Sequence, residues 1–418
     1  MSLETIDIHI KDLGTIITGG TPPTKKRDYY GNLVPLIKPT DMVLGQRYIG
    51  DTEESLSEMG VDKFKKKLVP KNTPCVVTIG TIGKSCLTKE LSLVNQAVNC
   101  VVVDESRFDY MYVYYLMQAT IHKVKAMDSG TASGRENVSK SVFESIDVRV
   151  VKLKEEQKKI GQVLSSYDTL VENNNRRIVI LEDMAQSLYR EWFVKFRFPG
   201  HENCKFKDSS LGKIPEGWEE LTIGDVAKVK GGKRLPKGKK VLDDETSYPY
   251  LRVKDFGENG IDRANIKFID EESHLATQRY IITTKDVYVS IAGTIGRVGI
   301  IPFILNNAHL TENAAKITGI TQPFLQHYIH RYLHSGTGRK LLISRASGSS
   351  QPKLALYKIA ELSLLLPTEE ILKEFNEYQE SMTASIHLLE NKNENLIKQR
   401  DMLLPKLISG KIDLNESD

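Results

Sequence analysis

The pentapeptide Gly-Thr-Ile-Gly-Lys/Arg occurs twice in this sequence, and its residue types are those of a phosphate-binding loop. The first copy starts at Gly80 and continues to "GKS" at 83–85. A nucleotide-binding loop needs G-x-x-x-x-G-K-[ST], because its glycines let backbone N–H groups wrap around the phosphates. Thr78 stands where the first glycine is required, and the second copy has Arg297 and Val298 in place of the lysine and the hydroxyl. We therefore interpret the pentapeptide as a tight turn between two strands, with a basic residue exposed at its end.

No other catalytic constellation is present in the sequence. It lacks H-E-x-x-H, G-x-S-x-G, a G-x-G-x-x-G that opens a helix after a strand, and the N/D-P-P-Y/F tetrapeptide of amino-methyltransferases. His327, His330 and His334 have helical spacing, and the alternatives are a metal-binding face or a solvated helix face. We expect the solvated face, because no Cys or carboxylate joins the three. The sequence thus predicts a binding protein that is no enzyme by itself and holds no cofactor or metal.

Composition fits a globular chain of several domains in a reducing compartment. The 418 residues are 40% hydrophobic and 27% charged, and at roughly 100–200 residues per domain they predict two to four domains. The net charge of +4 is too small to indicate a polybasic protein. The basic stretch 228–240 is either a solvated surface or an anion-binding patch. Four cysteines without CxxC spacing indicate cytosolic thiols. Since no signal-peptide pattern and no window of ~18 apolar residues is present, we expect a cytoplasmic protein without membrane contact.

A repeat extends far beyond the pentapeptide and organises the whole chain. Matching segments keep their order in both halves: "TGGTPPTKK" at 18–26 with "KGGKRLPKG" at 230–238, "PLIKPTDM" at 35–42 with "PYLRVKDF" at 249–256, "YYLMQA" at 114–119 with "RYLHSG" at 331–336, "SGRENVSKSVFESIDV" at 133–148 with "SGSSQPKLALYKIAEL" at 347–362, and "VENNN" at 171–175 with "LENKN" at 389–393. The separation grows from about 212 to about 218 residues, as surface insertions produce in a duplicated unit. The chain therefore consists of two homologous halves.

Each half combines short β-type runs with one long helix. Runs such as "PCVVTIG" and "DVYVSIAG" are rich in β-branched residues and bounded by turn residues, which predicts strands. Apolar residues then recur at heptad spacing over 155–190 and 369–405, which predicts two helices of roughly 50 Å that bury their stripes against each other. The predicted helix–helix seam comprises Ile160, Leu164, Tyr167, Val171, Asn174, Ile178, Leu181, Leu188, Phe375, Met382, Ile386, Leu389, Leu396 and Leu403.

The predicted fold class is α+β, with two repeated globular units built on β-sheets and joined by two long antiparallel helices. This coiled-coil spacer would give the molecule a pseudo-twofold axis. The predicted segments are a first globular domain at 1–150, a central helix and connector at 151–205, a second globular domain at 206–366, and a terminal helix and tail at 367–418. Asn174 lies on the seam and either fixes the helix register or is hydrated where the seam is loose.

Three segments carry a resemblance to a known family. "LEDMAQSLYREWFVKFRFPG" at 181–200, "LGKIPEGWEE" at 211–220 and "QRDMLLPKLISGKIDL" at 399–414 resemble the central and C-terminal segments of the specificity subunits of type I restriction–modification systems. Together with the duplicated layout, the resemblance covers essentially the whole chain. It implies two target-recognition domains, each of which binds one half of an asymmetric, bipartite DNA sequence.

The resemblance also implies partners. The long helices would dock two methyltransferase subunits, which bind S-adenosylmethionine and methylate adenine, and restriction/translocase subunits would complete a nuclease that cleaves unmodified DNA. The partners would carry the catalysis and the cofactor, in agreement with the missing motifs of this chain. The recognised bases, the spacer length and the oligomeric state without partners do not follow from the sequence.

A DNA-binding role predicts which side chains meet the duplex. Phosphate contacts should come from Lys and Arg in turns, and base contacts from polar side chains on loops that enter the major groove. The candidates are Lys25, Lys26, Arg27, Lys38, Lys84, Arg135 and Asn137 in the first half and Lys233, Arg234, Lys237, Arg252, Lys254, Arg297, Gln351 and Lys353 in the second.

Three other hypotheses stay open at this point. The first is a specificity subunit of a related system whose partner fuses nuclease and methyltransferase in one chain. The second is a phosphohydrolase with an atypical phosphate loop, which would bind ATP tightly. The third is a coiled-coil scaffold without DNA affinity, which would bind no duplex even at low salt.

Overall fold

Two compact units make up the chain, and each contains half of each long helix. The computed structural model describes residues 2–43, 45–128, 136–210, 212–258, 260–263, 265–348, 351–412 and 414. Unit 1 comprises Met1–Arg176 and Glu390–Asp418, and unit 2 comprises Arg177–Leu389. The four segments predicted from the sequence divide the chain differently. They follow the order of the chain, whereas unit 1 also includes residues 390–418, which are distant in the sequence.

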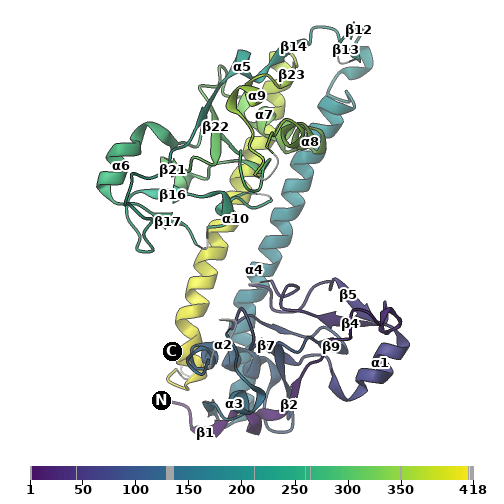
Figure 1. Cartoon of the computed structure of the whole chain (residues 1–418), viewed down its shortest axis with the longest axis vertical. Coiled ribbons are helices and arrows are strands. Elements are labelled where there is room, and N and C mark those ends of the chain that lie inside the picture. The colour runs from purple at the N-terminus through teal and green to yellow at the C-terminus, as the bar shows by residue number, and fades with distance from the viewer. Residues whose placement is uncertain are drawn as a thin grey trace. The chain divides into compact units, whose positions relative to one another are not determined.

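Unit 1 contains an antiparallel four-stranded sheet, a mixed five-stranded sheet and a two-stranded pair, together with part of one long helix (Figure 1). Its strands are β1 (Thr5–His9), β2 (Gly14–Thr18), β3 (Tyr30–Gly31), β4 (Val34–Ile37), β5 (Glu54–Leu56), β6 (Leu68–Val69), β7 (Pro74–Val77), β8 (Ser85–Leu87), β9 (Ser92–Val94), β10 (Val98–Val103) and β11 (Asp147–Val151). Its helices are α1 (Glu58–Phe64), α2 (Tyr110–Ala126), α3 (Lys140–Glu144) and the first part of α4 (Lys154–Tyr189). One sheet has the order β2-β10-β7-β8 and another β3-β5-β4-β9-β6, while β1 pairs with β11.

Unit 2 repeats this architecture. Its strands are β12 (Phe206–Ser209), β13 (Gly212–Pro215), β14 (Glu219–Thr222), β15 (Lys228–Gly231), β16 (Pro249–Leu251), β17 (Lys267–Phe268), β18 (Ile281–Ile282), β19 (Val287–Ser290), β20 (Val298–Ile300), β21 (Ala308–Leu310), β22 (Ala314–Thr318) and β23 (Ser363–Leu366). Its helices are α5 (Ile223–Val226), α6 (Glu271–Thr277), α7 (Leu325–His334), α8 (Gly336–Ser344), α9 (Leu356–Ala360) and the first part of α10 (Glu369–Ile408).

The strand orders of the two units correspond, except that β3 has no counterpart among the described strands of unit 2. The sheet β15-β22-β19-β20 matches β2-β10-β7-β8, the sheet β17-β16-β21-β18 matches β5-β4-β9-β6, and β14 pairs with β23 as β1 does with β11. Even the single parallel pairing recurs, with Leu36 opposite Leu93 in unit 1 and Tyr250 opposite His309 in unit 2. The hairpin β12–β13 and helix α8 are the additions of unit 2. The predicted α+β fold with two repeated units is confirmed.

Apolar burial explains why these segments form the core. All four residues of β7 and all four of β19 are buried, as expected for central strands covered on both faces. In unit 1 they lie under α2, whose N-terminus is capped by Asp109 through a bond from the Tyr112 amide to the carboxylate. In unit 2 the core is closed by the aromatic cluster of Trp192, Phe193 and Phe375, whose rings lie 4.7–6.2 Å apart. In each unit, a central strand of the four-stranded sheet thus lies within the apolar core.

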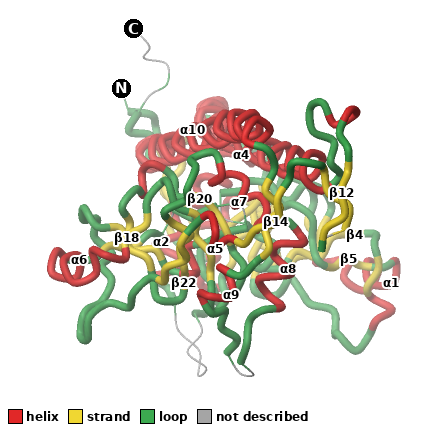
Figure 2. Tube along the Cα trace, turned by 90° about the horizontal axis from the view of Figure 1, so that it is seen from above, coloured by secondary structure: helices red, strands yellow, loops and turns green. Residues whose placement is uncertain are grey.

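Helices α4 and α10 pack antiparallel within each unit (Figures 1 and 2). Of the predicted seam residues, Ile160, Leu164, Val171, Phe375, Ile386 and Leu389 are buried, and Tyr167, Asn174, Ile178, Leu181, Leu188, Met382, Leu396 and Leu403 are half-buried. In unit 1, Asn174 donates from Nδ2 to Asn393 Oδ1 at 2.9 Å, and Asn393 donates to Asn175 Oδ1 at 2.8 Å. Because Asn174 has this partner across the seam, the structure favours the register hypothesis over the hydrated one. The twofold relation between the units stays a prediction.

Candidate nucleic-acid interface

The repeated pentapeptide forms the same turn in both units. In unit 1 it joins β7 to β8, with Gly80 and Gly83 at φ values of 87° and 109°. In unit 2 it joins β19 to β20, with Gly293 and Gly296 at 73° and 84°. These left-handed conformations favour glycine, which explains why both glycines of each copy are kept. The interpretation as a turn between two strands is therefore confirmed.

Strand register brings the predicted residues of unit 1 to one end of its four-stranded sheet. Asn99 lies opposite both Thr18 at the end of β2 and Val76 near the end of β7. The loop with Lys25, Lys26 and Arg27 and the pentapeptide turn with Lys84 therefore leave the sheet at the same end. Two further contacts bring in the remaining segments: Lys84 Nζ donates to the Pro39 carbonyl at 3.1 Å, and residue Asn137 forms a β-bridge with Ile79.

The same convergence occurs in unit 2. Gly231 at the end of β15 lies opposite Ala315, and Ser290 at the end of β19 lies opposite Ala314. The loop that carries Lys233, Arg234 and Lys237 thus leaves the sheet beside the turn that carries Arg297. The segment with Gln351 and Lys353 joins them through a bridge between Ala292 and Lys353. Arg252 and Lys254 follow β16, whose Leu251 carbonyl accepts from the Thr311 amide at 3.1 Å. These residues are far apart in the sequence, and the sheet gathers them at one edge.

Several predicted contact residues are already engaged within the protein. Lys38 pairs with Glu53 and Glu54 at 3.2 and 2.9 Å, and these carboxylates raise the pKa of its ammonium. Arg252 pairs with the buried Asp255 at 2.7 Å. These side chains brace loops, and their charge is compensated.

Arg234 and the two pentapeptide cations are also held. Arg234 Nε pairs with Glu312 at 2.7 Å, and Arg297 pairs with Glu258. The expectation of an exposed basic residue at the end of each turn is wrong, since Lys84 and Arg297 are both half-buried. The hydrogen bond of Lys84 to Pro39 and the ion pair of Arg297 fold their side chains back onto the domain.

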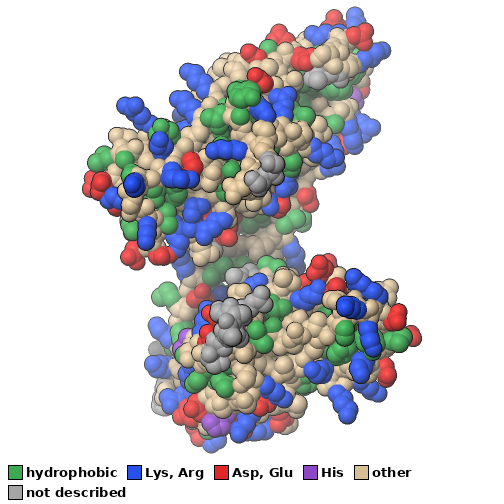
Figure 3. All heavy atoms as spheres, in the orientation of Figure 1, with side chains coloured by type: hydrophobic (Ala, Val, Ile, Leu, Met, Phe, Trp, Pro, Cys, Tyr) green, Lys and Arg blue, Asp and Glu red, His purple; other side chains and the backbone are tan. Residues whose placement is uncertain are grey.

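The remaining candidates point to solvent. These exposed residues are Lys25, Lys26, Arg27, Lys233, Lys237, Lys254, Gln351 and Lys353, and Arg234 is exposed as well although it is paired with Glu312. Some of these cations lie over aromatic rings, as Lys26 does over Tyr29 at 5.6 Å and Lys233 over Tyr280 at 5.7 Å. Arg135 lies outside the described residues. Figure 3 shows Lys and Arg side chains interspersed with Asp and Glu on both units, in line with the small net charge.

A hollow in unit 1 adds polar residues that sequence reasoning missed. A cavity of about 530 Å³ beside the pentapeptide turn is lined by residues that include Thr81, Asn95, Gln96 and Glu136. Gln96 is exposed in the tip that joins β9 to β10. An exposed glutamine amide matches the donor–acceptor edge of adenine in the major groove. The internal repeat could have pointed to Gln96, because it aligns the tip between β9 and β10 with the tip between β21 and β22, and Glu312 is the polar residue equivalent to Gln96.

The expected solvated histidine face is wrong. His327 and His330 are 6% and 8% exposed, and burial lowers the pKa of His327 to about 4. Both histidines lie on the part of helix α7 that packs into unit 2. Arg331 of the same helix is also buried, and its Nε donates to Gln379 of α10. Among the described residues, no group of three or more His, Cys, Asp or Glu side chains is placed to hold a metal ion. Within the same residues, no helix is both long enough and apolar enough to cross a membrane.

Comparisons with known proteins agree with this architecture. A type I restriction enzyme specificity subunit of Methanocaldococcus jannaschii, MjaIX, is 26% identical over 97% of this chain and 93% of its own. The EcoBI specificity subunit of Escherichia coli is 21% identical over 90% of this chain and 78% of its own. The crystal structure of the S subunit of a type I system from M. genitalium covers 97% of this chain and 96% of its own, with a TM-score of 0.58 at 15% identity, and shows the same fold. The family model for the type I restriction modification DNA specificity domain matches residues 6–183 and 215–399, and the chain belongs to this family of DNA specificity subunits.

Proposed function

We propose that each unit binds one half of a bipartite, asymmetric duplex DNA target, with the sheet edge that carries the pentapeptide turn facing the DNA. The observation that carries this proposal is the duplicated convergence of basic and polar loops at the same end of the same sheet. Two equivalent edges with different side chains suit two different half-sites. Lysine and arginine there supply sequence-independent contacts to phosphates, while Gln96 and Gln351 are candidates for base contacts.

We further propose that the long helices dock methyltransferase subunits, whose active sites supply the chemistry and bind S-adenosylmethionine. Restriction/translocase subunits would join the same assembly. The support is the apolar surface that the helices leave uncovered. In unit 2, Val179, Ile180 and Met184 of α4 are 51–57% exposed, and Leu388 of α10 is 54% exposed. Large exposed apolar side chains on adjacent helical turns mark surfaces that bind other proteins.

Genome-wide mapping of methylated adenines tests the half-site proposal. The chain is expressed with its methyltransferase partner, and the methylated motif reports both half-sites and the spacer. We expect Gln96→Ala to relax the motif at one or two positions of one half-site only. A discriminating contact of this type is worth about 1–3 kcal/mol per base pair.

Gln351→Ala in unit 2 is the matched variant, and we expect it to relax the other half-site only. A double variant should relax both. If Gln96→Ala changes positions in both half-sites, or if both variants change the same half-site, the assignment of one half-site to each unit is wrong.

Salt-dependent binding to random duplex separates this proposal from a scaffold without DNA affinity. Each phosphate contact contributes about 0.9 to the slope of log K against log salt. We expect the triple variant Lys25→Ala/Lys26→Ala/Arg27→Ala to reduce that slope by up to about 3, with Lys63→Ala/Lys65→Ala/Lys66→Ala as the control for net charge. Absence of binding at low salt would favour the scaffold, and tight ATP binding would favour a phosphohydrolase. The gene of the partner distinguishes a fused nuclease–methyltransferase from separate subunits.

A further inference from the structure

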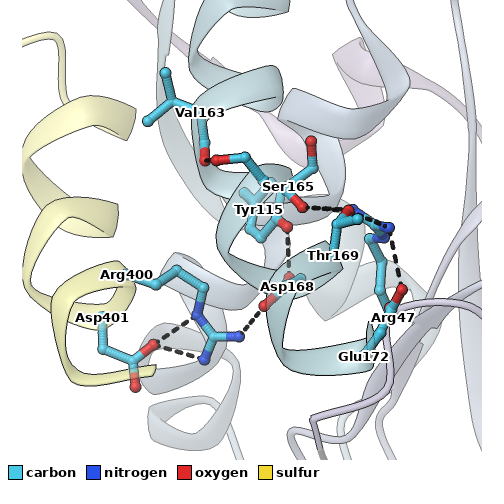
Figure 4. A network of polar contacts seen from close by, with 10 residues as sticks. Arg47, Tyr115, Val163, Ser165, Asp168, Thr169, Glu172, Arg400 and Asp401 are labelled. Carbon is cyan, nitrogen blue, oxygen red and sulfur yellow. Dashed lines mark hydrogen bonds and ion pairs between the residues drawn. The ribbon is translucent and has the colours of Figure 1, made fainter. Parts of the chain in front are cut away.

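A buried ion pair joins three helices in unit 1. Asp168 of α4 is 3% exposed, and it accepts from Tyr115 Oη of α2 at 2.5 Å and pairs with Arg400 of α10 (Figure 4). Arg400 is held a second time by Asp401 at 2.7 Å. One turn further along α4, Arg47 pairs with Glu172 at 3.3 Å. The attraction of Asp168 raises the pKa of Arg400, which therefore stays charged. The cation that pairs with Asp168 in this unit comes from α10.

Unit 2 also contains a buried ion pair, but in this unit the long helix contributed by the other half supplies the anion instead of the cation. Arg331 of α7 is 1% exposed and pairs through Nη1 with Glu182 of α4 at 2.5 Å. Its Nε donates to Gln379 of α10 at 2.8 Å, and Gln379 donates to the Ala185 carbonyl at 3.0 Å. Here the long helix contributed by the other half supplies an anion, and the unit's own helix α7 supplies the cation. Removing one partner of such a pair would leave an uncompensated buried charge.

The internal repeat shows what each helix would present if it met a copy of itself. The match of "VENNN" with "LENKN" places Glu182 at the position of Arg400. Alignment by the first residues of the helices, Lys154 and Glu369, places Ala185 there, and Glu182 is one turn away. In the first alignment α4 has a carboxylate at the position where α10 has a guanidinium, and in the second that carboxylate lies one turn away.

We propose that these two ion pairs form a pairing code that admits α4 with α10 and rejects α4 with α4 or α10 with α10 from a second copy of the chain. In an α4–α4 pair, Asp168 would face Glu182 of the other copy, and two buried carboxylates would repel. In an α10–α10 pair, Arg331 would face Arg400 of the other copy, and two buried cations would repel. The mixed pair alone neutralises both sites.

The asparagines of the seam carry no such discrimination. Asn174 and Asn175 both bond to Asn393, and an α4–α4 pair would offer Asn175 in place of Asn393. Amide side chains donate and accept equally, so they set register in either pairing. Register and partner identity are therefore specified by different residues. If each unit binds one half-site, the code also keeps the target asymmetric; this consequence alone rests on the proposed function.

The exchange variant Glu182→Arg/Arg400→Glu tests the code in the full-length chain. It keeps composition and net charge, but the introduced carboxylate would lie beside Asp168 and the introduced guanidinium beside Arg331, while both self-pairings become neutral. We expect the variant to associate through helix exchange, with an association constant raised by roughly tenfold or more over wild type, since buried like charges are strongly unfavourable. Light scattering at several concentrations and co-purification of two differently tagged copies measure this.

Two matched variants sharpen the test. Asp183→Arg/Lys398→Glu exchanges charges on the same two helices at exposed positions and should leave the wild-type association unchanged. Glu182→Gln/Arg400→Gln removes both pairs without repulsion and should also fail to raise association tenfold. The code is wrong if the exchange variant associates as wild type does, or if the neutral variant associates as strongly as the exchange variant.

A separate measurement covers the case in which the exchange variant does not fold. Arg400→Glu alone should lower the unfolding temperature of unit 1, and Asp168→Lys added to it should recover at least half of the loss. Recovery shows that the charge relation at this site matters rather than the shape of the side chains. Equal unfolding temperatures for the single and double variants would overturn the proposal.

Discussion

The two units share one sheet order and fill it with different side chains. Across the middle of the four-stranded sheet, unit 1 places Cys86, Cys75 and Cys100 side by side on β8, β7 and β10. The same row in unit 2 is Gly299, Tyr288 and Lys316. Three buried thiols are thus replaced by a tyrosine that lies over a glycine and by a buried lysine.

Packing volume explains how one topology holds both rows. A Cβ on Gly299 would collide with the hydroxyl oxygen and ring of Tyr288, so the absent side chain is the space that the ring occupies. The ring is fully buried and stacks on Phe256 at 4.3 Å. In unit 1 each thiol fills only its own position. The same strand order therefore accommodates a large ring in unit 2, because the neighbouring glycine leaves room for it.

The largest expected effect comes from filling the space at Gly299. Because Tyr288 cannot move away from its stack, Gly299→Ala should destabilise unit 2 by about 3 kcal/mol, the upper end for overpacking a core. The matched change in unit 1, Cys86→Ala, only removes a small side chain and should cost about 1 kcal/mol. Denaturant unfolding followed by tryptophan fluorescence measures unit 2, because both tryptophans of the chain, Trp192 and Trp218, lie there.

A double variant isolates the cause. With the ring gone in Tyr288→Cys, adding Gly299→Ala should cost nothing further, since the methyl group then has room. If the alanine costs as much without the ring as with it, the loss arises from the strand backbone, and the volume argument is wrong.

Histidines provide a second contrast between the units. Seven of the nine histidines lie in unit 2, and among them His309, His327 and His330 are buried. Burial lowers the pKa of His309 and of His327 to about 4, and it lowers that of His330 as well. In unit 1, His122 is exposed and His9 is half-buried. Only unit 2 therefore buries neutral imidazoles among the described residues.

Acid should unfold unit 2 before unit 1. At His309 and His327 the unfolded chain binds protons near pH 6.5 and the folded chain only near pH 4. The stability that depends on these neutral imidazoles is therefore present above about pH 6.5 and is lost as pH falls towards 4. Hydrogen exchange resolved by peptide compares the two units over that range. We expect His327→Gln to shift the acid midpoint of unit 2 to lower pH and to leave unit 1 unchanged. Equal acid midpoints for both units in the wild-type chain would contradict this.

The sequence predicted the parts of the molecule that repetition and periodicity record. The pentapeptide turn, the two homologous folds and the long helices each leave a pattern in the residues themselves. Partners across space leave none: nothing near Arg297 in the sequence shows that Glu258 will hold it, and nothing in α7 shows that the face of His327 meets the core. The loops of the candidate interface were therefore predicted from the sequence, whereas the ion pairs and the burial of their side chains are seen only in the structure.

The smallest effect distinguishes the two pentapeptide cations. Lys84 donates to a backbone carbonyl, which carries no net charge, whereas Arg297 shares the carboxylate of Glu258 with Arg339. Lys84→Ala should therefore lower the slope of log K against log salt for random duplex by up to about 0.9, and Arg297→Ala should leave it nearly unchanged. Glu258→Gln frees both arginines and should steepen the slope. Equal losses for Lys84→Ala and Arg297→Ala would show that DNA displaces Glu258 and that the two units use their turns alike, which would break the contrast in charge that the free protein shows.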